Sequence, residues 1–162
     1  MTERVLVGMS IREADAASEL RVAAEEAGAR LAFLQISEPA LSTVLNELAD
    51  AGATRIELVG VSFGPLAPGL SWLRRVAAHW WRERGPEPPE IMIATALVGP
   101  EIGEHGAIEA AAQEVRPIRG TEPVIAVQPD DVWYGGILPT DVTRLIDAHL
   151  VAGRPLDEKR IR

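Results

Sequence analysis

Short apolar runs alternate with longer amphipathic segments over the first two-thirds of the chain. Continuous apolar runs of this length are typical of strands that are buried on both faces. The amphipathic segments carry their apolar residues at helical spacing, on one side only. The expected strands are 4–8, 31–36, 55–63 and 90–97, and the expected helices are 11–27, 39–48, 70–80 and 108–115.

Strands separated by helices of this length imply βαβ units, which place the strands parallel in one sheet with right-handed crossovers. We therefore predict an α/β fold for residues 1–118, with a four-stranded parallel sheet flanked by helices.

The pattern changes in residues 119–162, which we assign to a C-terminal extension. Apolar segments 123–128 and 132–137 flank the triplet Pro129-Asp130-Asp131, whose residue types favour a turn, so a β-hairpin is expected there. A final helix is expected to begin at Pro139, and the hairpin and helix are expected to add to the same body as the sheet. The apolar stripe of that helix comprises Val142, Leu145, Ile146, His149 and Leu150.

Composition narrows the class of protein. Of the 162 residues, 47% are hydrophobic, which is ordinary for a globular core. The formal net charge of −8 argues against nucleic acid and anionic membranes as partners, because both attract basic surfaces. No run approaches the roughly 18 apolar residues of a membrane span. The N-terminus lacks the apolar core of a signal peptide, so a cytoplasmic location is expected.

Cysteine is absent, which excludes disulfides, thiolate nucleophiles and cysteine-ligated clusters, so we expect no iron–sulfur cluster. The three histidines do not have the i, i+4 spacing of a helical metal pair. His149 is expected to be packed and hydrogen-bonded, and His105 to lie at the surface. His79 lies on a helix rich in tryptophan and arginine, which forms either a cationic partner surface or a sheet-packing helix with solvated arginines.

Ligands of open parallel sheets bind at the carboxyl ends of the strands, which directs attention to residues 8–13, 35–39, 61–69 and 96–103. Neither a dinucleotide fingerprint nor a phosphate-binding loop occurs there. The loop 63–69 contains two glycines and two prolines and no titratable side chain.

These segments resemble the small class II chelatases, which insert cobalt or iron into sirohydrochlorin. Residues 7–12 (VGMSIR) are similar to the family's VGHGSR, residues 32–41 (AFLQISEPAL) to AFLELAEPSL, and residues 52–60 (GATRIELVG) to GARRIVVVP. The resemblance covers residues 4 to about 115 and implies a chelatase-like βαβ fold. Because the small chelatases are half-size proteins that pair, it also implies a homodimer or a place in a larger assembly.

The sequence departs from that pattern at the residues that the resemblance assigns to metal insertion. The family's two histidine positions fall at Met9 and near Pro68, and the resemblance implies that these imidazoles hold the metal or accept pyrrole protons. Methionine is a soft, weak ligand and proline is none. Glu38 either contacts a metal or interacts with the N-terminus of the next helix. The ligand-cleft candidates are Met9, Ser10, Arg12, Glu38, Ser62, Gly64 and Pro68.

A second resemblance covers residues 127–155 (VQPDDVWYGGILPTDVTRLIDAHLVAGRP), which are similar to the C-terminal end of thioredoxin-like [2Fe-2S] ferredoxins. That family's cluster-binding cysteines lie upstream, where this chain has none. The resemblance therefore implies a structural remnant without its redox centre. The matching positions are Pro129, Asp130, Trp133, Tyr134, Pro139, Asp141, Val142, Ile146, His149, Leu150, Gly153 and Pro155.

Three hypotheses of function follow. The first is a chelatase-like protein with a degenerate site, which inserts no metal and binds a tetrapyrrole or divalent metal or docks on a metalloenzyme. The second is an active chelatase of sirohaem or cobalamin biosynthesis whose rebuilt site uses Glu38, His105 or a partner's residues. The third is a structural subunit of a redox complex. The sequence leaves open whether the protein is an enzyme.

Overall fold

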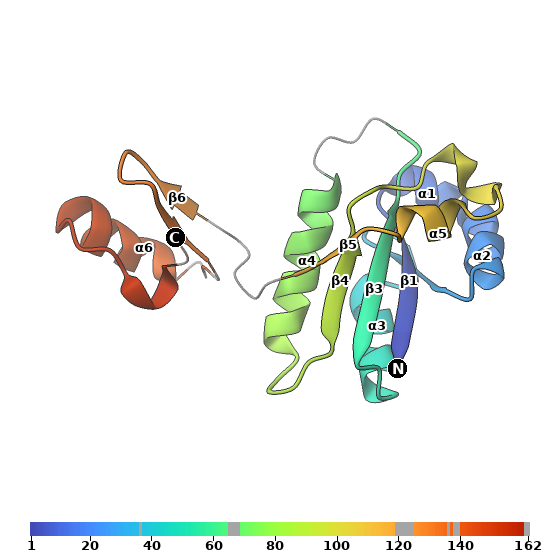
Figure 1. Ribbon diagram of the computed structural model, residues 1–162, viewed down its shortest axis with the longest axis horizontal. Helices are drawn as coiled ribbons and strands as arrows, with labels where there is room; N and C mark the ends of the chain where they lie inside the picture. Colours follow the sequence, from blue (N-terminus) through green and yellow to red (C-terminus); the bar gives the residue numbers. More distant parts are fainter. Residues whose placement is uncertain (36, 65–68, 119–124, 136, 138–139, 161–162) are drawn as a thin grey trace. The chain divides into compact units, whose positions relative to one another are not determined.

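The computed structural model describes residues 1–35, 37–64, 69–118, 125–135, 137 and 140–160. The chain divides into two compact units, Met1–Ile118 and Arg119–Arg162 (Figure 1). Each unit is described by itself below.

The first unit is built on a five-stranded sheet with the order β2-β1-β3-β4-β5. Four strands run parallel, which confirms the predicted α/β class. The fifth, β5, pairs antiparallel with β4 at the edge of the sheet. The strands are β1 (Thr2–Gly8), β2 (Arg30–Phe33), β3 (Arg55–Val61), β4 (Glu90–Ala94) and β5 (Val115–Pro117).

The expected helix 108–115 is wrong in its second half. The helix α5 ends at Ala111, and Val115 pairs with Ala94 as the first residue of β5. A strand of three residues is too short to show a period of two in the sequence, and its proline fits only a sheet edge. The expected helix 11–27 is divided at Ala16 into two helices.

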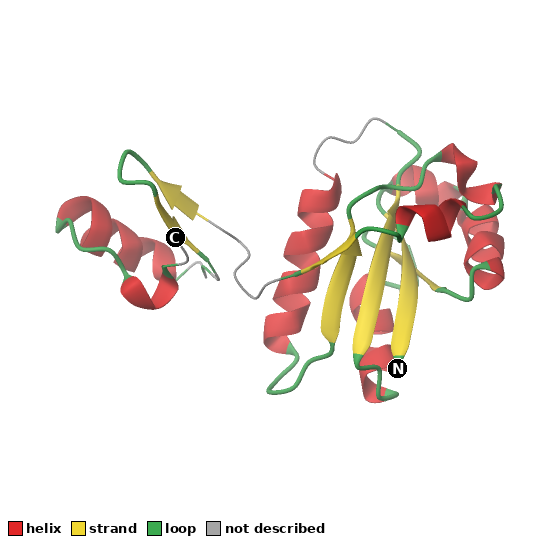
Figure 2. Ribbon diagram, viewed as in Figure 1, coloured by secondary structure: helices red, strands yellow, loops and turns green. Residues whose placement is uncertain are grey.

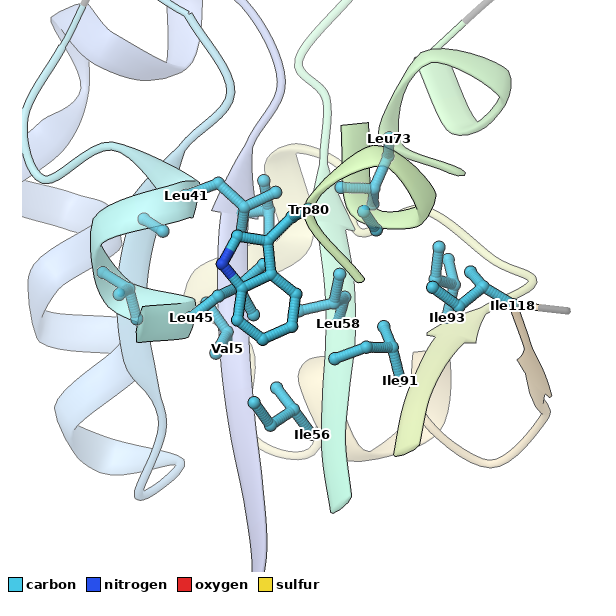
Figure 3. Close-up of a cluster of buried hydrophobic side chains, with 14 of the residues drawn as sticks. Val5, Leu41, Leu45, Ile56, Leu58, Leu73, Trp80, Ile91, Ile93 and Ile118 are labelled. Atoms are coloured by element: carbon cyan, nitrogen blue, oxygen red, sulfur yellow. The ribbon is translucent and has the colours of Figure 1, made fainter. Parts of the chain in front are cut away.

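Helices cover both faces of the sheet (Figure 2). One face packs on α3 and α4, and the other on α2 and α5, because alternate strand residues point to opposite faces. In the first of these layers, Trp80 of α4 and Leu45 of α3 pack on Leu58 of β3 (Figure 3). The helices are α1 (Ile11–Asp15), α2 (Ala17–Glu26), α3 (Leu41–Asp50), α4 (Gly69–Glu83) and α5 (Ala107–Ala111), with the 3₁₀ turn η1 (Pro100–Gly103).

The second unit contains an antiparallel hairpin of β6 (Ile125–Val127) and β7 (Val132–Tyr134). The predicted turn is confirmed, with Asp131 in the left-handed region at φ 51°. The hairpin forms a two-stranded sheet of its own, separate from the five-stranded sheet, and the expectation that it adds to the first body stays a prediction. The predicted residues Pro123, Val124 and Pro139 lie outside the described residues. The helix α6 (Asp141–Leu145) continues as the π-helical η2 (Ile146–Val151) and is followed by η3 (Asp157–Lys159).

The expected burial of the final helix's stripe is only partly correct. Leu145 and His149 are buried, but Val142, Ile146 and Leu150 are 41%, 43% and 59% exposed. Two strands of three residues each are enough to cover one side of the helix and leave the neighbouring side open.

Candidate functional site

The loops that follow β1 and β3 meet at the carboxyl edge of the sheet, where parallel sheets bind ligands. The backbone N–H of Met9 donates to the Val61 carbonyl at 3.1 Å, so the two strands stay paired up to the start of these loops. The edge therefore brings together most of the predicted ligand-cleft residues. Those on these two loops are Met9, Ser10, Arg12, Ser62 and Gly64, whereas Pro68 lies outside the described residues.

A fully buried carboxylate, Glu13, joins the two loops. It accepts the backbone N–H of Ser10 at 2.9 Å and that of Phe63 at 2.6 Å, and the Ser10 hydroxyl also donates to it. A buried carboxylate needs such donors to offset its lost hydration. Glu13 thus fixes the first loop against the third-strand loop.

Met9 directly follows β1, and its side chain points into the protein. It is 3% exposed and belongs to the apolar cluster beneath α3 and α4. A Cβ added at Gly60 would lie 3.4 Å from the Met9 sulfur and 2.8 Å from Leu97. The thioether therefore fills space above Gly60 and presents no donor to the outside.

Arg12 lies across Gly64. A Cβ at Gly64 would come within 2.6 Å of the Arg12 Nη1 atom, so the glycine makes room for the guanidinium. Arg12 is exposed, and within the described part of the chain its guanidinium makes no ion pair. A cation is thus available at the carboxyl edge of the sheet.

The remaining polar candidates are used by the protein itself. The Ser62 hydroxyl donates to the Gly64 carbonyl at 3.0 Å, and the Ser10 hydroxyl is bonded to Glu13. Glu38 is exposed and accepts the backbone N–H of Ala40 at 3.1 Å, directly before α3. Of the two roles considered for Glu38, the contact with the helix N-terminus is the observed one.

His105 lies away from these loops, on the rim of a hollow of about 460 Å³ that follows β4. Two carboxylates, Glu101 and Glu104, share the rim, but no three metal-binding side chains converge among the described residues. His79 is exposed on α4, whose Trp80 is buried and donates to Asn46 at 2.9 Å. Sheet packing therefore accounts for Trp80.

In the second unit, buried Tyr134 and buried His149 form a hydrogen-bonded relay that ends at the exposed Asp130. The Tyr134 hydroxyl bonds the Nδ1 atom of His149 at 2.7 Å, and the Nε2 atom of His149 bonds Asp130 at 2.9 Å. The Leu156 N–H donates to the Tyr134 oxygen at 3.2 Å. Every donor is used if the hydroxyl donates to His149 and His149 donates to Asp130.

A carboxylate, an imidazole and a hydroxyl are hydrogen-bonded in this order in catalytic relays as well. Tyr134, however, is 0% exposed, so no substrate can reach its hydroxyl. The relay instead connects the hairpin to the helix and to the segment before η3. The prediction that His149 is packed and hydrogen-bonded is confirmed.

The sequence interpretation missed Glu13. Its signal is Ser10-Ile11-Arg12-Glu13, the S-x-x-E spacing of a capping box, in which the glutamate reaches back to the first residue's N–H. It also overlooked Trp72, which is 51% exposed. Trp72 lies in the first turn of α4, and this helix begins at the same edge of the sheet because it follows β3.

Three comparisons with known proteins place the chain in context. No family model matches it. A segment of 35 residues is 46% identical to a "Ferredoxin, 2Fe-2S" of Aquifex aeolicus (strain VF5), covering 22% of this chain. The chain spans about a third (32%) of the length of that curated relative.

Among solved structures, "SirB from Bacillus subtilis with Fe3+" overlaps 58% of this chain and 39% of its own, with a TM-score of 0.48 and 19% identity. In the described residues, no helix is long and apolar enough to span a membrane.

Proposed function

We propose that this protein binds a tetrapyrrole of the sirohydrochlorin class at the carboxyl edge of the first unit's sheet and does not insert metal into it. The resemblance of residues 7–12, 32–41 and 52–60 to the class II chelatases supports the ligand class. The edge formed by the loops after β1 and β3 supports the place of binding.

The burial of Met9 is the main support for the proposal that the protein does not catalyse metal insertion. Metal insertion needs a group that presents the ion and a base that accepts the pyrrole protons. An imidazole serves both needs because it titrates near neutral pH and binds borderline metals. At Met9 a thioether lies inside an apolar cluster, 3% exposed, where it can do neither.

Arg12 supplies the polar contact in this proposal. Sirohydrochlorin is a conjugated ring with carboxylate side chains, and a guanidinium pairs well with carboxylates. Arg12 is held across Gly64 with its charge available. Ile11 and Trp72, which are 57% and 51% exposed, offer apolar surface on the first turns of α1 and α4 at the same edge.

Equilibrium binding of sirohydrochlorin, followed by quenching of tryptophan fluorescence, tests this proposal. We expect saturable quenching that is mostly lost in Trp72→Phe. We expect Arg12→Gln to weaken binding by about tenfold, the order of a charge-assisted contact of roughly 1.5 kcal/mol. Arg21→Gln on α2, an equally exposed arginine, is the matched control and should change nothing. Equal losses in both arginine variants would point to unspecific attraction and contradict the proposal.

Docking as a subunit, or pairing with a second copy, is the second candidate function. Its support is the exposed stripe Val142, Ile146 and Leu150 on α6 and η2 of the second unit. If that stripe is an interface, Ile146→Glu should lower the mass measured by light scattering, or release a co-purifying protein, without affecting sirohydrochlorin binding.

A further inference from the structure

A hollow follows β4, on elements that the proposed tetrapyrrole site does not use. The segment Ala96–Val98, the turn η1 and the helix α5 border an open hollow of about 460 Å³. Small-molecule sites typically measure roughly 300–1,000 Å³, so this volume is sufficient for a ligand. Carboxyl ends of parallel strands are also where open sheets bind ligands.

The lining divides into a small apolar floor and an acidic rim. Leu97 and Val98 and three alanines of α5 (Ala107, Ala110 and Ala111) provide aliphatic surface. Glu101, Glu104 and His105 form the polar part, and none of the described residues that line the hollow is a lysine or an arginine. The local charge is therefore negative, in a chain whose net charge is already −8.

Glu101 is held in place by the backbone. Its Oε1 atom accepts the Gly99 N–H at 3.0 Å, and this bond is the main cause that lowers the pKa of the Glu101 carboxyl. A Cβ at Gly99 would lie 2.7 Å from the Oε2 atom, so only glycine leaves room for this arrangement. One carboxylate oxygen is thus fixed and charged at the hollow, at neutral pH.

We propose that this hollow binds a small aliphatic amine in its ammonium form. The ammonium group is placed at Glu101 and Glu104, and the short hydrocarbon part lies on the alanine floor. An anionic ligand is disfavoured by the two carboxylates, and a chelated metal by the lack of three converging ligands among the described residues. The alanine methyl groups suit a narrow aliphatic chain.

The test uses the full-length, ¹⁵N-labelled protein and 1,4-diaminobutane as the probe, at constant ionic strength. Saturable shifts are expected at the Gly99 and Gly106 amides, which flank the hollow, and none at Gly52 or Gly85, which lie in the turns before β3 and β4 at the opposite edge of the sheet. The uncharged 1,4-butanediol has nearly the same shape and should cause no saturable shift. Equal shifts with the diol, or no shift at Gly99 and Gly106 at millimolar amine, would overturn the proposal.

Variants distinguish specific amine binding in the hollow from non-specific attraction to the acidic surface of the protein. Glu101→Gln combined with Glu104→Gln should weaken amine binding at least tenfold, whereas Glu83→Gln on α4 removes an exposed acid elsewhere and should leave it unchanged. Ala110→Leu should also abolish binding, because it fills the hollow from an exposed helical position that leucine suits. Unchanged binding in Ala110→Leu, or an equal loss in Glu83→Gln, would show only attraction to an acidic surface. Arg12→Gln should not affect amine binding.

Discussion

The Glu13 carboxylate accepts the backbone N–H of Phe63 at 2.6 Å, across 50 residues of sequence. Through this bond, and those to Ser10, one buried side chain sets the distance between the loops that follow β1 and β3. The arrangement of Arg12 over Gly64 depends on that distance, since the two residues belong to the two joined loops.

Replacing Glu13 with glutamine tests the importance of this connection. A glutamine has one acceptor oxygen, so its amide group must face an N–H donor and leave buried hydrogen bonds unsatisfied. We expect Glu13→Gln to lower the free energy of unfolding of the first unit by about 1–3 kcal/mol. Urea unfolding measures this loss, with the exposed Glu19→Gln on α2 as a control that stays unchanged. A Glu13→Gln protein as stable as the control would contradict a joining role.

Gly64→Ala separates the position of Arg12 from the stability of the fold. The new Cβ meets only the flexible end of Arg12, which can move aside, so the change in stability should stay within about 0.5 kcal/mol. Sirohydrochlorin binding should weaken, because the guanidinium is displaced. Gly60→Ala is the contrasting variant: its Cβ meets Leu97 and Met9 in the packed interior and should cost about 1–3 kcal/mol. Similar stabilities of the two variants would count against this description of the edge.

Tyr134→Phe addresses the relay of the second unit. The variant removes the hydroxyl that lies between the Leu156 N–H and His149, so two buried polar groups lose their partner. We expect the second unit to lose about 1–3 kcal/mol, while the first unit keeps its stability. Amide hydrogen exchange read separately in the two units measures this. Val151→Ala, at a residue 76% exposed, is the control. Unaltered protection of β6 and β7 in Tyr134→Phe would argue against the relay's structural role.

Glu101 provides a prediction about titration. Because the Gly99 N–H favours the ionised form, the folded-state pKa of Glu101 lies below the usual 4.5 of a glutamate side chain. The stabilising bond is therefore present at neutral pH and is lost as the pH falls through that lowered pKa. A side-chain ¹³C titration should show a midpoint below 4.5 in the native protein and a higher one in Gly99→Ala, whose Cβ displaces the carboxylate. Identical midpoints in the two proteins would refute the assignment to Gly99.

The parallel strands were predictable because a strand buried on both faces is a continuous apolar run, as in residues 91–94. The edge strand β5 was not predictable, because three residues are too few to show the alternation of apolar and polar residues that marks a strand. Val142 and Ile146 have the spacing of buried residues, yet burial is decided by what covers the helix, which spacing does not encode. The rule that ligands bind at the carboxyl edge of a parallel sheet predicts one candidate region containing Met9, Arg12 and Gly64, and that site stays a prediction. The inward direction of Met9 could not be predicted, because it depends on the space above Gly60.

The most direct measurement of the central claim is the absorbance of sirohydrochlorin after addition of Co²⁺, with and without the protein. The account predicts the same insertion rate in both, since general acid–base help alone is typically worth a hundredfold or more and Met9 cannot give it. Met9→His alone should not raise the rate, because the second histidine of the class II chelatase pattern is also missing from the sequence, where Ala67-Pro68-Gly69 stands. A clear rate increase that depends on the wild-type protein would contradict the account and establish an active chelatase with a rebuilt site.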